Sequence, residues 1–159
     1  MKIHIGADHA GFYLKEELRS FLEFLGHEVI DMGAGTYERF DDYTDYVFPV
    51  ARAVAKDSES RGIVIGSSGQ GEGTAANRIK GIRAFVYYGT ALPLPETAKV
   101  GVPKDIVTIS REDNDSNVLA LGASFVPEEE AKEVIKRWLE TPFTGEERHQ
   151  RRIRKLDNF

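Results

Sequence analysis

The stretch RGIVIGSSGQGEGTAANR, residues 61–78, decides the fold. Its first part, Gly62–Gly66, is a continuous apolar run, which is typical of a strand that helices cover on both faces. A loop of glycine and serine follows, and the small residues of Glu72–Arg78 predict a short helix. A buried strand, a tight loop and a helix in this order indicate one unit of a parallel α/β sheet.

Strands and helices alternate on both sides of this stretch. Further strands are predicted at Lys2–Gly6, Glu28–Met32, Arg83–Tyr88 and Asn117–Leu121. Apolar residues at helical spacing predict helices at Phe12–Leu25, Tyr43–Lys56, Pro127–Glu140 and Gly145–Leu156. Because Pro49 interrupts the second of these patterns, that helix is expected to start near Pro49 or to kink there.

Two segments of the second half are less regular. Gly89–Val102 holds two prolines and is predicted to be a loop. Pro103–Asp113 suits a strand or a helix, and a proline followed by the acidic Asp105 favours a helix start. We therefore predict that residues 1–159 form one domain, a doubly wound, five-stranded parallel sheet in a flavodoxin-like or Rossmann-like three-layer α/β sandwich.

The composition is that of an ordinary globular protein, and it excludes several functions. The chain has 159 residues, the size of one domain. Its 21 basic and 26 acidic residues give a net charge of −5, so we expect no binding to nucleic acid. The absence of cysteine excludes disulfides and thiolate chemistry. Because no signal peptide or membrane-spanning run is visible, we expect a cytoplasmic protein with no membrane partner.

Polar residues follow the first and third predicted strands, at the sheet edge where parallel α/β proteins bind ligands. Asp8 and His9 follow the first strand. Gly66–Gly73, after the third, lacks the dinucleotide fingerprint because Thr74 replaces the last glycine, and lacks a P-loop because Glu72 stands in the lysine position. Exposed amides beside a carboxylate are what removal of a proton next to a carbonyl requires.

Each of these features also has a purely structural interpretation. The glycines can form a tight turn, with Glu72 an ordinary residue of the first helical turn. Asp8 and His9 can cap the first helix, and because adjacent side chains point in different directions we expect no metal site there. In the basic C-terminal tail, Arg148 and Arg152 lie one helical turn apart and can grip a phosphate, or the helix is simply solvated.

Taken in order, these motifs resemble the type B ribose-5-phosphate isomerases and the related galactose-6-phosphate isomerase subunits. The resemblance rests on IGADHAGF at Ile5–Phe12, GSSGQGEGTAANR at Gly66–Arg78, GIRA at Gly81–Ala84, NDSNVLALG at Asn114–Gly122 and RHQRRI at Arg148–Ile153. It implies an aldose–ketose isomerase of a small phosphorylated sugar that uses no cofactor. It also implies a homodimer or dimer of dimers with sites at the subunit interface, and a C-terminal helix that reaches the partner.

The resemblance also assigns roles to individual residues. Glu72 becomes the base, because the family uses either this glutamate or a cysteine at the position that is Gly66 here. The residues implied in catalysis are Glu72, Ser68, Asp8 and Asp113. Those implied in substrate binding are His9, Ser67, Gly69, Gly71, Asn77, Asn114, Arg148 and Arg152. Among the latter, the two arginines match phosphate ligands, and Asn114 matches a contact donated across the dimer.

Two departures from the family's pattern bear on the substrate. Members that open a furanose ring carry a histidine just before the Asn-Asp pair, where this chain has Asp113. Several members also carry an arginine phosphate ligand after the fifth strand, where this chain reads Ala123-Ser124. We therefore expect the enzyme to prefer sugars with a high open-chain fraction, tetrose phosphates among them, to ribose 5-phosphate.

Two functions of other classes compete with an isomerase. One is a non-catalytic flavodoxin-like module that binds a sugar phosphate or a nucleotide. Glu72 argues against this module, because a carboxylate at the mouth of an anion-binding loop repels the ligand. The other is a nicotinamide-dependent oxidoreductase, which the missing fingerprint disfavours.

Overall fold

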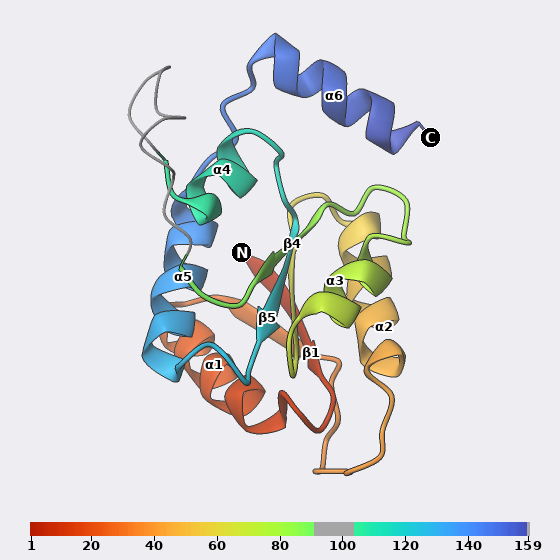
Figure 1. Ribbon diagram of the computed structural model, residues 1–159, viewed down its shortest axis with the longest axis vertical. Coiled ribbons are helices and arrows are strands. Elements are labelled where there is room, and N and C mark those ends of the chain that lie inside the picture. Colours follow the sequence, from red (N-terminus) through yellow and green to blue (C-terminus); the bar gives the residue numbers. More distant parts are fainter. Residues whose placement is uncertain (91–103, 159) are drawn as a thin grey trace.

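The computed structural model describes residues 1–90 and 104–158 (Figure 1). Five parallel strands form one sheet in the order β2-β1-β3-β5-β4. Their bounds are Lys2–Ala7 for β1, Glu28–Asp31 for β2, Arg61–Gly66 for β3, Ala84–Tyr87 for β4 and Val118–Gly122 for β5. The predicted parallel α/β sheet is thereby confirmed, with one difference: β5 lies between β3 and β4, so the last two strands are exchanged relative to the flavodoxin order.

Helices cover both faces of the sheet (Figure 1). The helices on one face are α1 (Phe12–Phe24), α4 (Ile106–Glu112) and α5 (Glu128–Glu140), and those on the other are α2 (Tyr43–Lys56) and α3 (Gln70–Ala76). Side chains of β3 alternate between the two layers, as the period of a strand dictates. Ile63 and Ile65 belong to the core under α1 and α5, whereas Val64 belongs to the core under α2 and α3.

A sixth helix, α6 (Glu147–Asp157), belongs to neither layer. It lies near the amino-terminal ends of β4 and β5, where Arg83 Nη1 is 3.3 Å from Asp157 Oδ1 (Figure 1). Within α6 only His149 is buried. The basic side chains of this helix therefore remain on the surface of the protomer.

The predictions for the less regular segments had different outcomes in the structure. Asp105 begins α4, and its Oδ1 accepts hydrogen bonds from the backbone N–H groups of Val107 and Thr108 at 3.0 and 3.1 Å, so the helical interpretation was right. The helix α2 begins well before Pro49 and continues through it. Most of the loop expected at Gly89–Val102 lies outside the described residues. None of the described helices has the length and apolar composition needed to cross a membrane.

The strand order locates the ligand crevice. Both β2 and β3 pair with β1, on opposite sides of it, so the chain changes direction between β1 and β3. At such a switch point a crevice opens outside the carboxyl ends of the strands. Asp8 and His9 follow β1 at this point, and the glycine-rich loop follows β3. The pairing of Ala7 with Ile65 brings the two strand ends side by side.

Candidate active site

The glycine-rich loop after β3 is held against the end of β5. The backbone oxygen of Ser67 accepts a hydrogen bond from the N–H of Ser124 at 2.9 Å, and the two Oγ atoms are also 2.9 Å apart. Gly69 has a φ of +76°, and a Cβ there would lie 3.0 Å from the carbonyl carbon of Leu121. Both the backbone conformation and the close approach therefore require glycine at this position.

Ser68 and Gly71 lie on either side of the start of α3. The Oγ of Ser68 accepts a weak hydrogen bond from the N–H of Gln70 at 3.3 Å, and Gly71 belongs to the first turn of the helix. Both residues are half-buried, so they remain partly accessible to a ligand. The loop therefore places a hydroxyl and helix-terminal backbone at the carboxyl-terminal edge of the sheet, and such groups stabilise a developing oxyanion.

Glu72 folds back from the first turn of α3 over the end of β3. It is 5% exposed, and its carboxylate fills the space above Gly66, where an added Cβ would overlap Oε1 and Cδ. Burial raises the pKa of Glu72, a hydrogen bond from its own backbone N–H lowers it, and the charge of Asp8 raises it again. The net rise makes this carboxylate a stronger base than an exposed glutamate.

Asp8 is the second buried carboxylate at this edge, with 7% exposure. Its Oδ1 accepts hydrogen bonds from the backbone N–H groups of Ala10 at 3.0 Å and Gly11 at 3.4 Å, just before α1. These bonds close the turn that leads into α1, but they reach no N–H group of the helix itself, so Asp8 does not cap α1. Burial raises the pKa of Asp8 against the opposing effects of these hydrogen bonds and of His9, so Asp8 is a stronger base than an exposed aspartate.

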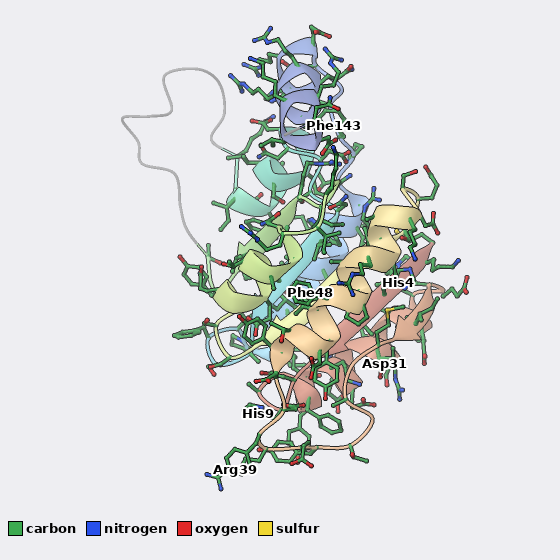
Figure 2. All side chains as sticks on the ribbon, turned by 90° about the vertical axis from the view of Figure 1, so that its right-hand side faces the viewer. His4, His9, Asp31, Arg39, Phe48 and Phe143 are labelled. Carbon is green, nitrogen blue, oxygen red and sulfur yellow. The ribbon has the colours of Figure 1, made fainter. Side chains whose placement is uncertain are left out.

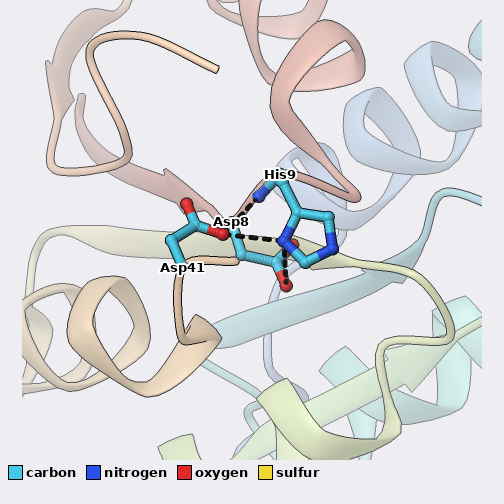
Figure 3. A group of neighbouring side chains, drawn as sticks. All are labelled: Asp8, His9 and Asp41. Atoms are coloured by element: carbon cyan, nitrogen blue, oxygen red, sulfur yellow. Dashed lines mark hydrogen bonds and ion pairs between the residues drawn. The ribbon is translucent and has the colours of Figure 1, made fainter. Parts of the chain in front are cut away.

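His9 is held by a carboxylate from a distant part of the chain (Figure 3). Asp41, in the connection between β2 and α2, accepts a hydrogen bond from the His9 backbone N–H at 2.9 Å, and the same Oδ1 lies 2.7 Å from Nδ1 of the ring. This hydrogen bond raises the pKa of His9. The protonated, cationic ring is therefore favoured.

The expectation that Asp8 and His9 point in different directions was wrong. The ring nitrogen Nδ1 of His9 lies 3.8 Å from Asp8 Oδ2, and Figure 3 shows the three side chains converging. One ligand atom from each of Asp8, His9 and Asp41 lies within 4.8 Å of the others, a spacing that a metal ion can use. Because Nδ1 already lies at hydrogen-bonding distance from Asp41, it would have to leave this contact to bind a metal ion.

The remaining predicted residues lie at the opposite, amino-terminal edge of the sheet. Asp113 ends α4, and Asn114 follows it before β5 begins. Arg148 and Arg152 project from exposed positions of α6. The structure therefore brings the predicted residues together in two groups, one at each edge.

Figure 2 shows that these two groups lie toward opposite ends of the molecule. His9 lies at one end of the molecule, and Phe143, which leads into α6, lies near the other. The five residues of β5 separate the two edges by a length on the order of 15 Å. A single small sugar phosphate therefore does not touch both groups of one chain.

Asp113 has a buried histidine of α6 beside it. His149 Nε2 lies 3.6 Å from Asp113 Oδ1 and accepts a hydrogen bond from Nε of Arg148 at 3.1 Å. The same Nε is 2.8 Å from a carboxylate oxygen of Glu146. Arg148 is thus already engaged within α6, whereas its neighbour one turn later, Arg152, is exposed.

Asn77, expected to bind substrate, is bonded to the backbone instead. Its Oδ1 accepts a hydrogen bond from the N–H of Ala84 at 2.7 Å, and its Nδ2 donates to the Ala84 carbonyl at 3.1 Å. These bonds tie the end of α3 to the start of β4, so Asn77 has a structural role in this chain whether or not it also contacts the substrate. Asn77 and Asn114 line a cavity of about 720 Å³ beside α6, at the edge away from Glu72.

Two residues of these clusters were not singled out from the sequence. Asp41 lies 32 positions from His9, in an acidic stretch with no motif that points to a partner. His149 is part of the quoted RHQRRI motif, but a charge run gives no sign that one of its members is buried. The sequence signal for a role of His149 was its position between the two candidate phosphate ligands, Arg148 and Arg152.

Comparisons with known proteins match nearly the whole chain to one family. The model of the family described as Ribose/Galactose Isomerase matches residues 3–92 and 97–156. Ribose-5-phosphate isomerase B of Escherichia coli (strain K12) is 41% identical over 152 residues, covering 96% of this chain and 91% of the relative.

Solved structures of ribose-5-phosphate isomerases B also resemble this chain over nearly its whole length. Ribose-5-phosphate isomerase B from Mycoplasma genitalium, solved with bound ribulose-5-phosphate, superposes with a TM-score of 0.85 at 32% identity, over 99% of this chain and 94% of that one. The corresponding enzyme from Clostridium thermocellum has a TM-score of 0.84 at 40% identity, over 99% and 96%.

Proposed function

The chain belongs to the ribose/galactose isomerase family, and on that premise we propose that it interconverts an aldose phosphate and a ketose phosphate with Glu72 as the base. Its relative in Escherichia coli is named ribose-5-phosphate isomerase B, and the Mycoplasma genitalium structure holds ribulose-5-phosphate. The chain is accordingly an aldose–ketose isomerase of a phosphorylated sugar. The identity of the base and the origin of the substrate contacts are the proposed parts.

The observation that carries the proposal is the carboxylate of Glu72, buried over Gly66 at the mouth of the glycine-rich loop. Glu72 takes the proton from C2 of the open-chain aldose, and the electron pair forms the C1–C2 double bond of an enediolate. Ser68 and the loop amides stabilise the negative oxygen on C1. Asp8 assists the transfer of the hydroxyl proton from O2 to O1, and Glu72 returns its proton to C1, which yields the ketose.

A second subunit supplies the other end of the substrate site. The phosphate requires cations, and Arg148 and Arg152 lie at the edge opposite Glu72, as does Asn114. Residues at opposite edges of one chain meet when two chains pair in antiparallel fashion about a two-fold axis. We infer that each site of a homodimer combines Glu72 of one subunit with Arg152 of the other, and that α6 makes this reach. His9 lies on the Glu72 side and binds the same phosphate.

Loss of either arginine is expected to weaken substrate binding. Arg148→Ala and Arg152→Ala should each raise KM about 10- to 100-fold with little change in kcat, since each removes a charge-assisted hydrogen bond of about 1.5–3 kcal/mol. Arg151→Ala, an exposed neighbour on the same helix, is the matched control and should leave KM unchanged. Steady-state kinetics at two salt concentrations check the result, because added salt screens the same contacts. An unchanged KM in both variants removes the arginines from the site.

Mixing Glu72→Gln with Arg152→Ala, both nearly inactive when assayed at a substrate concentration far below the raised KM of Arg152→Ala, tests whether the site is shared. When Glu72→Gln and Arg152→Ala proteins exchange subunits, half the dimers are mixed, and each mixed dimer contains one intact site, so about one quarter of the wild-type activity returns. Mass spectrometry confirms that exchange has occurred. If activity stays absent in an exchanged mixture, each site is built within one chain.

Asp113 and Ser124 bear on which sugar is used. Opening a furanose needs a proton delivered to the ring oxygen, a step for which the family's histidine is the usual acid and for which this chain offers a carboxyl group instead. Ser124 lies against Ser67 and brings no positive charge to the edge where other members place an arginine. A tetrose 4-phosphate cannot close a furanose because its O4 carries the phosphate. We infer a preference for such open-chain substrates.

Substitution of Asp113 by histidine tests this preference. Asp113→His should raise kcat/KM for ribose 5-phosphate more than for erythrose 4-phosphate, because a neutral-pKa imidazole supplies the acid that ring opening needs. NMR in heavy water follows both substrates directly. The inference is wrong if the wild type converts ribose 5-phosphate with a kcat/KM at or above that of the open-chain sugar.

A further inference from the structure

Asp41 makes contacts that no motif in the sequence indicated. It lies just before α2, and its side chain is 7% exposed. One oxygen, Oδ1, receives both the backbone N–H and the ring nitrogen Nδ1 of His9, at 2.9 and 2.7 Å. The other oxygen, Oδ2, is buried and has no hydrogen-bond partner among the described residues.

We propose that Asp41 is a positioning residue that fixes the ring of His9 in the orientation that binds substrate. The proposal rests on the proposed role of His9 in phosphate binding. Because the backbone and the ring of His9 are bonded to the same carboxylate oxygen, the ring cannot turn about its side-chain torsions without breaking one of the two bonds. Nδ1 is used by Asp41, so Nε2 is the nitrogen left for the ligand. The His9 side chain is 35% exposed, which leaves room for a phosphate to approach.

The charges around the ring agree with this assignment. The hydrogen bond to Asp41 is the largest effect raising the pKa of His9, and Asp8, 3.8 Å away, adds to it against burial and the charge of Arg39. Burial alone would raise the pKa of Asp41, but hydrogen bonds, those from His9 foremost, hold it below the ordinary value. The contact therefore favours the imidazolium–carboxylate form of the pair, and an imidazolium donates a charge-assisted hydrogen bond to phosphate.

A purely structural role for Asp41 predicts a different outcome. Asp41 also faces Tyr46, in the first turn of α2, and burial and Asp41 raise the pKa of that tyrosine, so Asp41 contributes to the packing of α2 as well. A structural residue would change stability and all kinetic constants together. A positioning residue acts through His9 alone, so its effect disappears once His9 is gone.

The test uses the full-length enzyme and the variants Asp41→Asn, His9→Gln and the double variant. Asp42→Asn is the matched control, because Asp42 is exposed and its side chain makes no capping hydrogen bond. NMR of the imidazole nitrogens follows the titration of His9 in substrate-free protein, with His9→Gln identifying its signal among the four histidines. Steady-state kinetics across pH are measured in parallel, with thermal unfolding as a check on the fold.

We expect Asp41→Asn to lower the titration midpoint of His9 and to raise KM about tenfold near neutral pH, with kcat nearly unchanged. In the wild type KM should rise as pH increases through the raised pKa of His9, and in Asp41→Asn this rise should move to lower pH. The double variant should match His9→Gln alone. Asp42→Asn should behave as the wild type in both measurements.

Contrary results would distinguish a failure of Asp41 as the positioning residue from a failure of His9 as a phosphate ligand. If His9→Gln raises KM but Asp41→Asn changes neither KM nor the His9 titration, Asp41 does not position the ring, while the role of His9 stands. If His9→Gln leaves KM unchanged, the role of His9 fails and the positioning proposal fails with it. If Zn²⁺ added to the substrate-free enzyme displaces the Nδ1 proton and raises activity, the cluster is a metal site, and the proposal is overturned.

Discussion

Replacing Glu72 with glutamine is expected to lower kcat by about 10²–10⁴ and to leave KM nearly unchanged. Glutamine keeps the shape and the hydrogen bonding of the side chain but cannot accept the proton from C2. In heavy water the wild type should incorporate deuterium at C2 of the aldose, and the variant should not. Glu133→Gln, at an exposed position of α5, is the matched control and should exchange at the wild-type rate.

The pH dependence of the wild type follows from the same residue. Because burial raises the pKa of Glu72, kcat/KM should fall as pH decreases through that raised pKa, at a higher pH than an exposed glutamate of about 4.3 would give. Deuterium exchange that continues undiminished in Glu72→Gln would exclude this residue as the base.

As pH rises through the raised pKa of Glu72, the free energy of unfolding should fall while kcat/KM rises. A carboxyl whose pKa is raised in the folded state favours folding below the ordinary pKa, and this contribution is lost as pH rises through the raised value. Above that raised pKa the buried charge of Glu72 therefore costs folding free energy, which glutamine does not. A thermal midpoint at or above that of the wild type distinguishes loss of the base from loss of the fold.

Gly66→Ala is expected to lower kcat about 100-fold although residue 66 carries no reactive group. The added Cβ would occupy the space of Oε1 and Cδ of Glu72, so the carboxylate must move. A displacement of about 1 Å is enough to cost a factor on the order of 10². Gly35→Ala is the matched control, because a Cβ at that position meets no atom within 4 Å.

A second substitution keeps the Gly66 prediction testable if alanine also disturbs the core. Glu72→Asp shortens the side chain by one methylene and withdraws the carboxylate from residue 66. It should lower activity in the wild-type background but restore part of it in Gly66→Ala. A folded Gly66→Ala enzyme with wild-type kcat would show that the carboxylate does not need the space above residue 66.

The same overlap gives a physical reason for the family's two alternative bases. A cysteine at position 66 would bring its Cβ and Sγ into the volume that the Glu72 carboxylate occupies. One position or the other can carry the base, but the two side chains do not fit together in this backbone. The glycine at 66 is therefore as much a part of the site as the glutamate.

Much of the fold could be predicted because its signals are local. The apolar run at Gly62–Gly66 and the helical spacing of Tyr43–Lys56 each depend on a few consecutive residues, and both elements form where expected. Strand order depends on which strands pair, and no local pattern encodes this. That is why the position of β5 between β3 and β4 was not foreseen.

The candidate site shows the same difference between features that depend on neighbouring residues and features that depend on long-range contacts. Glu72 and the loop before it share one stretch of chain, so their proximity follows from the sequence. The contact of His9 with Asp41 joins residues 32 positions apart, and periodicity carries no information about it. Asn77 is a different case: a motif identified the residue, but no local pattern indicated that its amide is bonded to the backbone of Ala84.

If two subunits share each site as proposed, the placement of the two groups of residues at opposite edges of the sheet has a genetic consequence. A chain carrying both Glu72→Gln and Arg152→Ala would spoil each site of any dimer it enters, one through the missing base and the other through the missing cation. Expressed beside the normal chain in equal amount, it would leave only the pure wild-type pairs active. Inheritance of such an allele would be dominant, although each single substitution on its own would leave mixed dimers half functional.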